Sequence, residues 1–199
     1  ALALGEQADA AMAGNGDSGF ASRSAKVQRL EEILEEVIEA GDRALLFTQF
    51  AEWGLLLKAH LERKWRQEVP FLYGSTSKTE RQAMVDRFQE DPRGPQLFLL
   101  SLKAGGVGLN LTRASHVFHI DRWWNPAVEN QATDRAYRIG QQKRVLVHKF
   151  ITSGSVEEKI DRMIKEKSKL ANEIVGSGED WLGGMDVGQL KDLVSLSEE

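Results

Sequence analysis

Apolar residues recur with helical spacing over the stretch that begins at Ser24. From Val27 onward, apolar side chains stand three or four positions apart as far as Ile38, and the pattern ends at Gly41. This spacing predicts an amphipathic helix, because residues three and four positions apart share one helical face. The remaining positions are rich in glutamate, which indicates that the other face is solvated.

Five shorter apolar runs follow, and each predicts a β-strand, of which the first is expected to be buried. They cover residues 44–48, 69–73, 96–101, 116–120 and 145–151. Amphipathic stretches between them predict helices over roughly 51–66 and from a capping box at Ser77 and Glu80 to about Phe88. Apolar strands that alternate with such helices predict an α/β fold, in which helices cover both faces of a parallel sheet. Ligands of these sheets bind at the carboxyl ends of the strands.

The pattern divides the chain into four regions. Residues 1–23, rich in Ala, Gly and Ser, are expected to form a flexible linker, and residues 24–152 a single α/β domain. A second capping box at Ser155 and Glu158 predicts a long helix within 153–178. Its apolar side chains are expected to dock on the core (Val156, Ile160, Ile164 and Leu170). Residues 179–199, with one lysine against six acidic residues, form an acidic tail.

A further helix is predicted within the segment DRWWNPAVENQATDRAYRIGQ, residues 121–141. Asn125 is a suitable N-cap, Pro126 follows at the first helical position, and Gly140 marks the end of the helix. Positions 131, 135 and 138 of such a helix lie on one face, because they are four and three residues apart.

This face combines the amide of Gln131 with the guanidinium groups of Arg135 and Arg138. A guanidinium is a planar, permanently charged group that matches phosphate oxygens, and two of them suit the charge that develops during phosphoryl transfer. The alternative is an ordinary solvated face, on which Asp134 and Arg138 form an exposed ion pair. The arginine spacing alone does not decide between the two, and the other motifs favour phosphate binding.

Composition places the chain among soluble globular domains. It has 199 residues, of which 41% are hydrophobic and 28% charged. The absence of cysteine excludes disulfides and thiolate metal sites, and no other pattern resembles a metal site. No apolar run reaches membrane-spanning length, and no signal peptide is recognisable. We therefore expect no membrane partner and no bound metal, and nothing implies an oligomer.

The net charge of −4 is unevenly distributed. Residues 121–149 carry six basic residues against three acidic ones, whereas the excess of acid lies elsewhere. A local basic patch is compatible with phosphate contacts even when the average charge is negative.

Three stretches resemble a known family: RALLFTQF (43–50), LLSLKAGGVGLNLTRASHV (99–117) and HIDRWWNPAVENQATDRAYRIGQQKRV (119–145). They are similar to motifs IV, V and VI of the C-terminal RecA-like lobe of superfamily 2 helicase-type ATPases, specifically the Swi/Snf family of double-stranded-DNA translocases. The string WWNPxxxxQAxDRAxRIGQ is highly specific to that family. The resemblance implies a RecA-like sheet, ATP as cofactor, and a brace helix in the region 153–178.

The same resemblance implies roles for individual residues in nucleotide chemistry. Arg135 and Arg138 match the arginine fingers that reach the γ-phosphate of ATP, and Gln131 matches a polar residue that supports this contact. Gly108 and Asn110 match motif V positions that approach the nucleotide. A glycine-rich turn without function is the alternative for GGxG alone.

The resemblance also implies a surface for double-stranded DNA at the strand ends. Its candidate residues are Thr48, Gln49, Ser101 and Lys103, whose polar groups can bind phosphate without reading sequence. Trp123 is a further candidate, although paired tryptophans commonly serve a core or an interface. The histidines at 116, 119 and 148 fall in strands and are expected to be structural.

Two parts of an ATPase are missing from the sequence. It has no GxxxxGK[ST] phosphate loop and no DExx-type acidic motif, so it lacks the parts that hold the phosphates and the Mg²⁺. The resemblance implies that these parts belong to a preceding N-terminal RecA-like lobe. The chain alone is not expected to hydrolyse ATP. A DNA-docking or regulatory module without motor activity is the main alternative, and a strand-separating helicase would need a wedge that we do not find. Localisation follows the DNA: nucleoid and cytoplasm in a bacterium, nucleus in a eukaryote.

Overall fold

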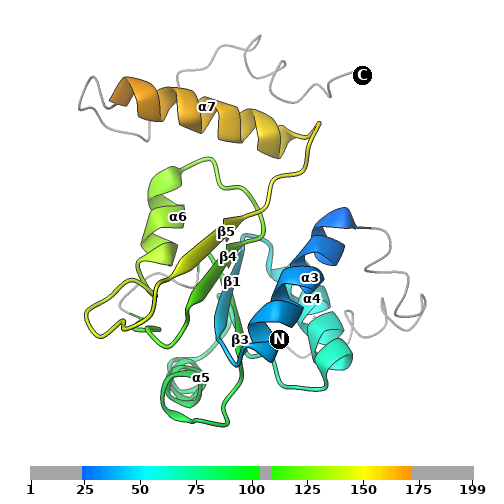
Figure 1. Ribbon diagram of the computed structural model, residues 1–199, viewed down its shortest axis with the longest axis vertical. Helices are drawn as coiled ribbons and strands as arrows, with labels where there is room; N and C mark the ends of the chain where they lie inside the picture. The colour runs from blue at the N-terminus through cyan, green and yellow to red at the C-terminus, as the bar shows by residue number, and fades with distance from the viewer. Residues whose placement is uncertain (1–23, 104–108, 172–199) are drawn as a thin grey trace.

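The computed structural model describes residues 24–103 and 109–171, and they form a parallel sheet covered by helices (Figure 1). The sheet has five strands in the order β2-β3-β1-β4-β5, and every neighbouring pair is parallel. The strands are β1 (Ala44–Thr48), β2 (Phe71–Leu72), β3 (Leu97–Ser101), β4 (His116–His119) and β5 (Leu146–Lys149). The predicted α/β class with a RecA-like sheet is confirmed. The regions 1–23 and 172–199, and Gly108, lie outside the described residues.

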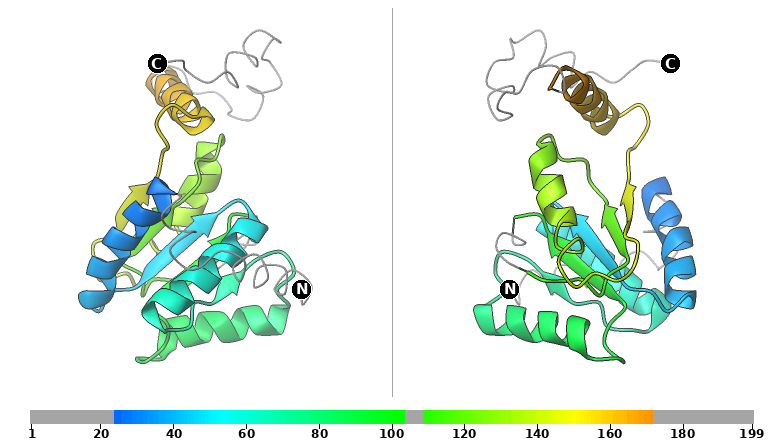
Figure 2. Two further views of the ribbon diagram at one scale, coloured as in Figure 1. Left: turned by 90° about the vertical axis from the view of Figure 1, so that its right-hand side faces the viewer. Right: turned by 60° about the vertical axis from the view of Figure 1, so that its left-hand side comes forward.

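Helices cover both faces of the sheet, as Figure 2 shows in two further views. On one face, α3 (Ala25–Glu39) and α4 (Ala51–Trp65) pack on the strands, and on the other face α5 (Lys78–Glu90) and α6 (Pro126–Thr133) do so. The last helix, α7 (Val156–Ala171), lies beyond the carboxyl edge of the sheet, next to the start of α6.

The central strand β1 explains the two-layered core. All five of its residues are buried, and their side chains alternate between the faces, as strand geometry requires. Phe47 packs in the layer of α5 and α6, whereas Leu46 packs in the layer of α3 and α4. An unbroken apolar run is therefore what this position demands.

Helix termini follow the sequence in most places. Ser24 caps α3 by accepting a hydrogen bond from the Val27 N–H, and Ser77 with Glu80 forms the predicted capping box of α5. The start of α7 differs. The Ser155 hydroxyl accepts from the Glu157 N–H at 3.2 Å, and the Glu158 carboxylate accepts from the Gly154 N–H at 2.8 Å, so the two side chains cap different amides than a capping box does.

The docked face of α7 is only partly the one predicted from apolar spacing. Val156 is exposed and Ile164 is buried, while the side chain of Leu170 lies outside the described set. Glu157 and Asp161 lie on the same face of α7 as Ile164, which follows them by seven and three residues, and both meet basic groups of the lobe. These two acidic residues dock because Lys26 and Arg122 of the lobe pair with them. A pattern of apolar residues does not predict such ion pairs.

Candidate functional site

The carboxyl edge of the sheet gathers several of the predicted residues. Thr48 and Ser101 end adjacent strands and are direct partners in the register of β1 and β3. Both residues are buried, with 0% and 5% of their surface exposed. Gln49 is partly buried and Lys103 is exposed just beyond the same edge. The structure thus brings the four predicted DNA-binding residues together, but exposes only the last fully.

The hydroxyl of Thr48 is already engaged within the lobe. It donates to Oδ2 of Asp121 and accepts from the N–H of Phe50 at 3.3 Å. The same Asp121 oxygen accepts the N–H of Gln49 at 3.0 Å. Asp121 therefore fixes the turn that follows β1, and in this conformation Thr48 offers no free hydroxyl to a phosphate.

The predicted helix through Gly140 is too long, because α6 ends at Thr133 and the chain continues in turns. Its start is as expected: Asn125 caps it through the Ala127 N–H, and Pro126 is the first residue. At its end the Thr133 hydroxyl donates to the Glu129 carbonyl oxygen at 3.1 Å and also contacts Nε2 of His119 at 2.8 Å. Such bonds from a threonine to the preceding turn compete with regular helix geometry.

Gln131, Arg135 and Arg138 consequently do not share one helical face. Gln131 is exposed on α6, Arg135 lies beyond the helix end and is only 5% exposed, and Arg138 is exposed further along. The single shared face inferred from the spacing is therefore wrong.

Arg135 is the unusual group of this region. Its Nε and Nη1 atoms are buried and find no hydrogen-bond partner among the residues that the structure describes. Burial, followed by repulsion from Arg138 and from Arg81 on α5, lowers the pKa of Arg135 to about 10. The guanidinium still carries its charge at neutral pH. A buried cation without a counter-charge is unfavourable, so this position suits an anion from outside.

Motif V meets motif VI at a backbone hydrogen bond. The N–H of Leu111 donates to the carbonyl oxygen of Arg135 at 3.0 Å. Asn110, one residue earlier, is exposed. Asn110 thus lies close in the chain to a direct contact with the arginine segment, whereas Gly108 falls outside the residues that the structure describes.

Trp123 is partly buried and packs against the apolar layer of α5 and α6. Its ring centroid lies 5.8 Å from that of Trp124, and its Nε1–H is buried without an acceptor in the described ranges. The packing fits a residue of the core.

His119 connects β4 to α6 through a hydrogen bond with Thr133. Because the Thr133 hydroxyl donates to Glu129, its oxygen is free to accept from Nε2–H of His119. Burial is the largest cause that lowers the pKa of His119 to about 4, so its ring is neutral at pH 7. His119 also stacks on Phe47.

Sequence reasoning missed a buried ionic cluster beside this site. Arg122, Glu129 and Asp161 are 5%, 0% and 7% exposed and are joined by ion pairs. In the sequence, Arg122 and Glu129 contribute only to the local net charge of residues 121–149. Their partners are recognisable only once β4, α6 and α7 are placed side by side.

Neither a metal centre nor a membrane span emerges from residues 24–103 and 109–171. These residues contain no group of three or more histidine, aspartate or glutamate side chains placed to hold a metal ion. Their helices are too short or too polar to cross a lipid bilayer.

The sheet, its engaged carboxyl edge and the buried arginine together define a RecA-like lobe of the helicase type. The sequence model of the Helicase conserved C-terminal domain matches residues 25–140, and the chain belongs to this family. Solved structures that it resembles include a SWI2/SNF2 ATPase core and a SWI2/SNF2 C-terminal domain, in agreement with the resemblance of the three motifs.

The structural likeness extends over nearly the whole chain. The C-terminal domain of the Sulfolobus solfataricus SWI2/SNF2 ATPase is 40% identical with a TM-score of 0.71, over 95% of this chain and 75% of that one. The ATPase core of the same organism in complex with double-stranded DNA is 41% identical with a TM-score of 0.74, over 99% of this chain and 41% of that one.

Curated relatives are much longer than this chain. The Bacillus subtilis protein YwqA, provisionally named as an ATP-dependent helicase/translocase, is 49% identical over 178 residues, which are 89% of this chain and 19% of YwqA. The DNA repair protein RAD5 of Saccharomyces cerevisiae is 40% identical over 166 residues, 80% of this chain and 14% of RAD5. The chain spans less than a fifth of either relative.

Proposed function

We propose that this chain is the second motor lobe of a Swi/Snf-type ATPase that is stimulated by double-stranded DNA. Residues 24–152 form the lobe, and the helix in the region 153–178 braces it. Arg135 and Arg138 reach the γ-phosphate of ATP held by an N-terminal RecA-like lobe of the same protein, which also holds the Mg²⁺. Gln131, Asn110 and Gly108 support the nucleotide side of the cleft.

The observation that carries this proposal is the buried guanidinium of Arg135. Two of its nitrogen atoms find no acceptor within the described part of the chain, and two further arginines repel it. Folding such a cation into the lobe is unfavourable on its own. A phosphate oxygen that arrives with the partner lobe supplies the missing acceptor, and charge-assisted hydrogen bonds of this kind are strong.

ATP hydrolysis then follows when this lobe closes on the N-terminal lobe. A guanidinium that is already held in place stabilises the charge of the transferring phosphoryl group without reorganising when the reaction occurs. In phosphoryl-transfer enzymes such a finger contributes on the order of 1,000-fold or more in rate. Hydrolysis removes the γ-phosphate contact and lets the lobes reopen. Each cycle of ATP binding and hydrolysis therefore shifts the DNA contacts of the lobes by one step along the duplex.

The DNA surface lies at the carboxyl edge of the sheet. Lys103 is exposed there, Gln49 is partly exposed, and the Trp123 indole N–H lacks a partner among the described residues. Thr48 and Ser101 are buried beneath them, so they support this surface unless the edge rearranges on binding. Contacts of this type bind the phosphate backbone without reading sequence, so binding should weaken as salt rises.

The test is ATP hydrolysis by this chain alone and by the full-length protein, each with and without double-stranded DNA. Hydrolysis confined to the full-length protein and stimulated by DNA supports the motor proposal. Hydrolysis by neither protein, with DNA binding retained, favours the docking module. Because the full-length protein works on DNA, its compartment is the nucleoid in a bacterium or the nucleus in a eukaryote.

A further inference from the structure

A buried ionic cluster connects α7 to α6 through Arg122. We name Arg122, Glu129 and Asp161 the Arg122 cluster. Arg122 lies in the segment between β4 and α6, Glu129 lies in α6, and Asp161 lies in α7. Nε and Nη2 of Arg122 contact the same Asp161 oxygen at 3.0 and 2.9 Å, and Nη1 pairs with Oε2 of Glu129. One guanidinium thus bridges two helices.

Both carboxylate oxygens of Glu129 are engaged by neighbouring groups. One carboxylate oxygen accepts the N–H of Trp123 at 3.0 Å, and the other accepts Arg122 and lies 3.1 Å from Nζ of Lys149. Burial alone would raise the pKa of Glu129, but the hydrogen bond from Arg122 and the other contacts outweigh it and the pKa is lowered. Glu129 is therefore ionised, and its partner charge cannot be removed without leaving a buried anion.

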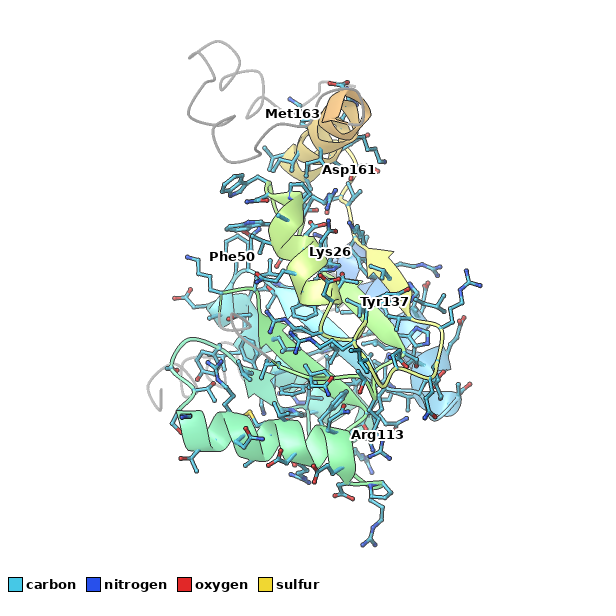
Figure 3. The ribbon with its side chains drawn as sticks, turned by 90° about the vertical axis from the view of Figure 1, so that its left-hand side faces the viewer. Lys26, Phe50, Arg113, Tyr137, Asp161 and Met163 are labelled. Atoms are coloured by element: carbon cyan, nitrogen blue, oxygen red, sulfur yellow. The ribbon has the colours of Figure 1, made fainter. Side chains whose placement is uncertain are left out.

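The first two turns of α7 are seated on the lobe by charge. Glu157 pairs with Lys26 of α3 at 2.6 Å and accepts the N–H of Thr152 at 3.0 Å. One turn later Asp161 meets Arg122, and Figure 3 shows Asp161 on the side of α7 that faces the lobe. Lys165 pairs with the other oxygen of Asp161 at 2.6 Å. The seat of α7 is thus ionic, with Ile164 as its buried apolar contact.

The helix on the other side of the bridge leads directly into the proposed finger. α6 has only eight residues, and Arg135 follows its C-cap Asp134 by one position. Two side-chain contacts hold α6 from opposite ends: Glu129 with Arg122 in the first turn, and Thr133 with His119 in the last. A shift of Arg122 therefore displaces the first turn of α6. Because α6 is short, the displacement extends to its end, which Arg135 closely follows.

We propose that Arg122 is a positioning residue, which transmits the seat of α7 to α6 and thereby sets the placement of Arg135. The role of Arg135 in this statement rests on the proposed function, whereas the coupling of α7 to α6 does not. Anything that lifts α7 from the lobe, such as docking of the partner lobe on this helix, then loosens the finger segment as well.

The first experiment measures hydrogen exchange in the 199-residue chain and needs no activity. Asp161→Asn removes the charge that Arg122 meets on α7 and leaves Glu129 paired. We expect the amides of residues 130–136 to exchange on the order of tenfold faster, together with those of α7. Arg162→Gln is the matched control, because Arg162 is exposed on the same helix and, among the side chains that the structure describes, its ion pair is with Glu158 at 3.9 Å. Faster exchange confined to α7 would overturn the coupling.

The second experiment measures DNA-stimulated ATP hydrolysis by the full-length protein. Asp161→Asn should lower kcat on the order of tenfold with little change in KM, because the finger acts in the transition state rather than in ground-state binding. Arg122→Lys should retain more activity than Arg122→Met, since a lysine keeps one of the two charge contacts. Equal activity of Asp161→Asn and wild type would refute the positioning role. If wild type itself does not hydrolyse ATP, the proposed function fails, and hydrogen exchange alone decides on the coupling.

Discussion

The N–H of Leu111 donates a hydrogen bond to the carbonyl oxygen of Arg135 at 3.0 Å. This bond ties the strand connection that carries motif V to the residue at the centre of motif VI. Arg135 is thereby fixed at its backbone, while two nitrogen atoms of its side chain remain without partners in the described part of the lobe. A rigid backbone below an unsatisfied charged side chain is an arrangement that favours function over stability.

The first prediction concerns the stability of this chain. Arg135→Leu should raise its free energy of unfolding by about 1–2 kcal/mol, because an apolar side chain replaces a buried charge for which the described residues supply no counter-charge. Urea unfolding followed by circular dichroism measures this change. Arg138→Leu is the control, since Arg138 is exposed and its replacement should stay within about 0.5 kcal/mol. A loss of stability in Arg135→Leu would mean that the guanidinium is satisfied after all.

The second prediction concerns catalysis by the full-length protein. Arg135→Lys keeps a positive charge but loses the planar fork, so DNA-stimulated ATP turnover should fall by on the order of 100-fold or more. Arg138→Ala should fall comparably. DNA affinity, measured by fluorescence anisotropy, should change little in both variants, because neither residue belongs to the proposed DNA surface. Wild-type turnover in both would end the assignment of these arginines as fingers.

How far the sequence predicts this lobe depends on the range of the interactions. β1 was predicted with its observed bounds, because four apolar residues followed by a β-branched threonine, between Arg43 and Gln49, specify a central buried strand. The end of α6 was not, because it is set by contacts with His119 and Leu111, which come from other parts of the chain. The pairing of Arg122 with Asp161 joins residues 39 positions apart, and no local pattern encodes it.

Burial of the site residues was equally beyond the sequence. Thr48 and Ser101 were predicted to face DNA from their positions at strand ends, yet the structure buries both. A strand end can be covered by the loop that follows it, and here Asp121 holds that loop over Thr48. The prediction that these residues touch DNA remains open to experiment.

The third prediction separates a DNA contact from a structural hydroxyl. Thr48→Val removes the hydroxyl that donates a hydrogen bond to Asp121, and it should lower the free energy of unfolding by about 1–2 kcal/mol. The affinity of the folded chain for double-stranded DNA should stay within about twofold. Lys103→Ala should do the reverse. It should leave stability unchanged and reduce the slope of log affinity against log salt by about 0.9, the share of one phosphate contact.

Lys64→Ala is the matched control for the DNA measurement. Lys64 is also an exposed lysine, but it lies at the end of α4 remote from the carboxyl edge of the sheet and pairs with Glu31 at 2.8 Å. Its removal should not alter the salt slope. A strong loss of DNA affinity in Thr48→Val with unchanged stability would instead place that hydroxyl on the phosphate backbone, as the family resemblance implies.

The last prediction concerns pH. The pKa of His119 is lowered from its ordinary value of 6.5 to about 4, mainly by burial, so the unfolded chain takes up a proton between these values before the folded chain does. Stability is therefore retained above pH 6.5 and decreases as the pH falls toward 4. For His119 alone, the free energy of unfolding should drop by about 2 kcal/mol between pH 7.5 and pH 5. Burial also lowers the pKa values of His116 and His148, which act in the same direction.

Urea unfolding at the two pH values measures the decrease in the free energy of unfolding. His119→Gln can still donate to Thr133 but does not titrate, so in this variant the decrease should be smaller by about 2 kcal/mol. An unchanged pH dependence in His119→Gln would show that the buried ring is not the group that destabilises the lobe in acid.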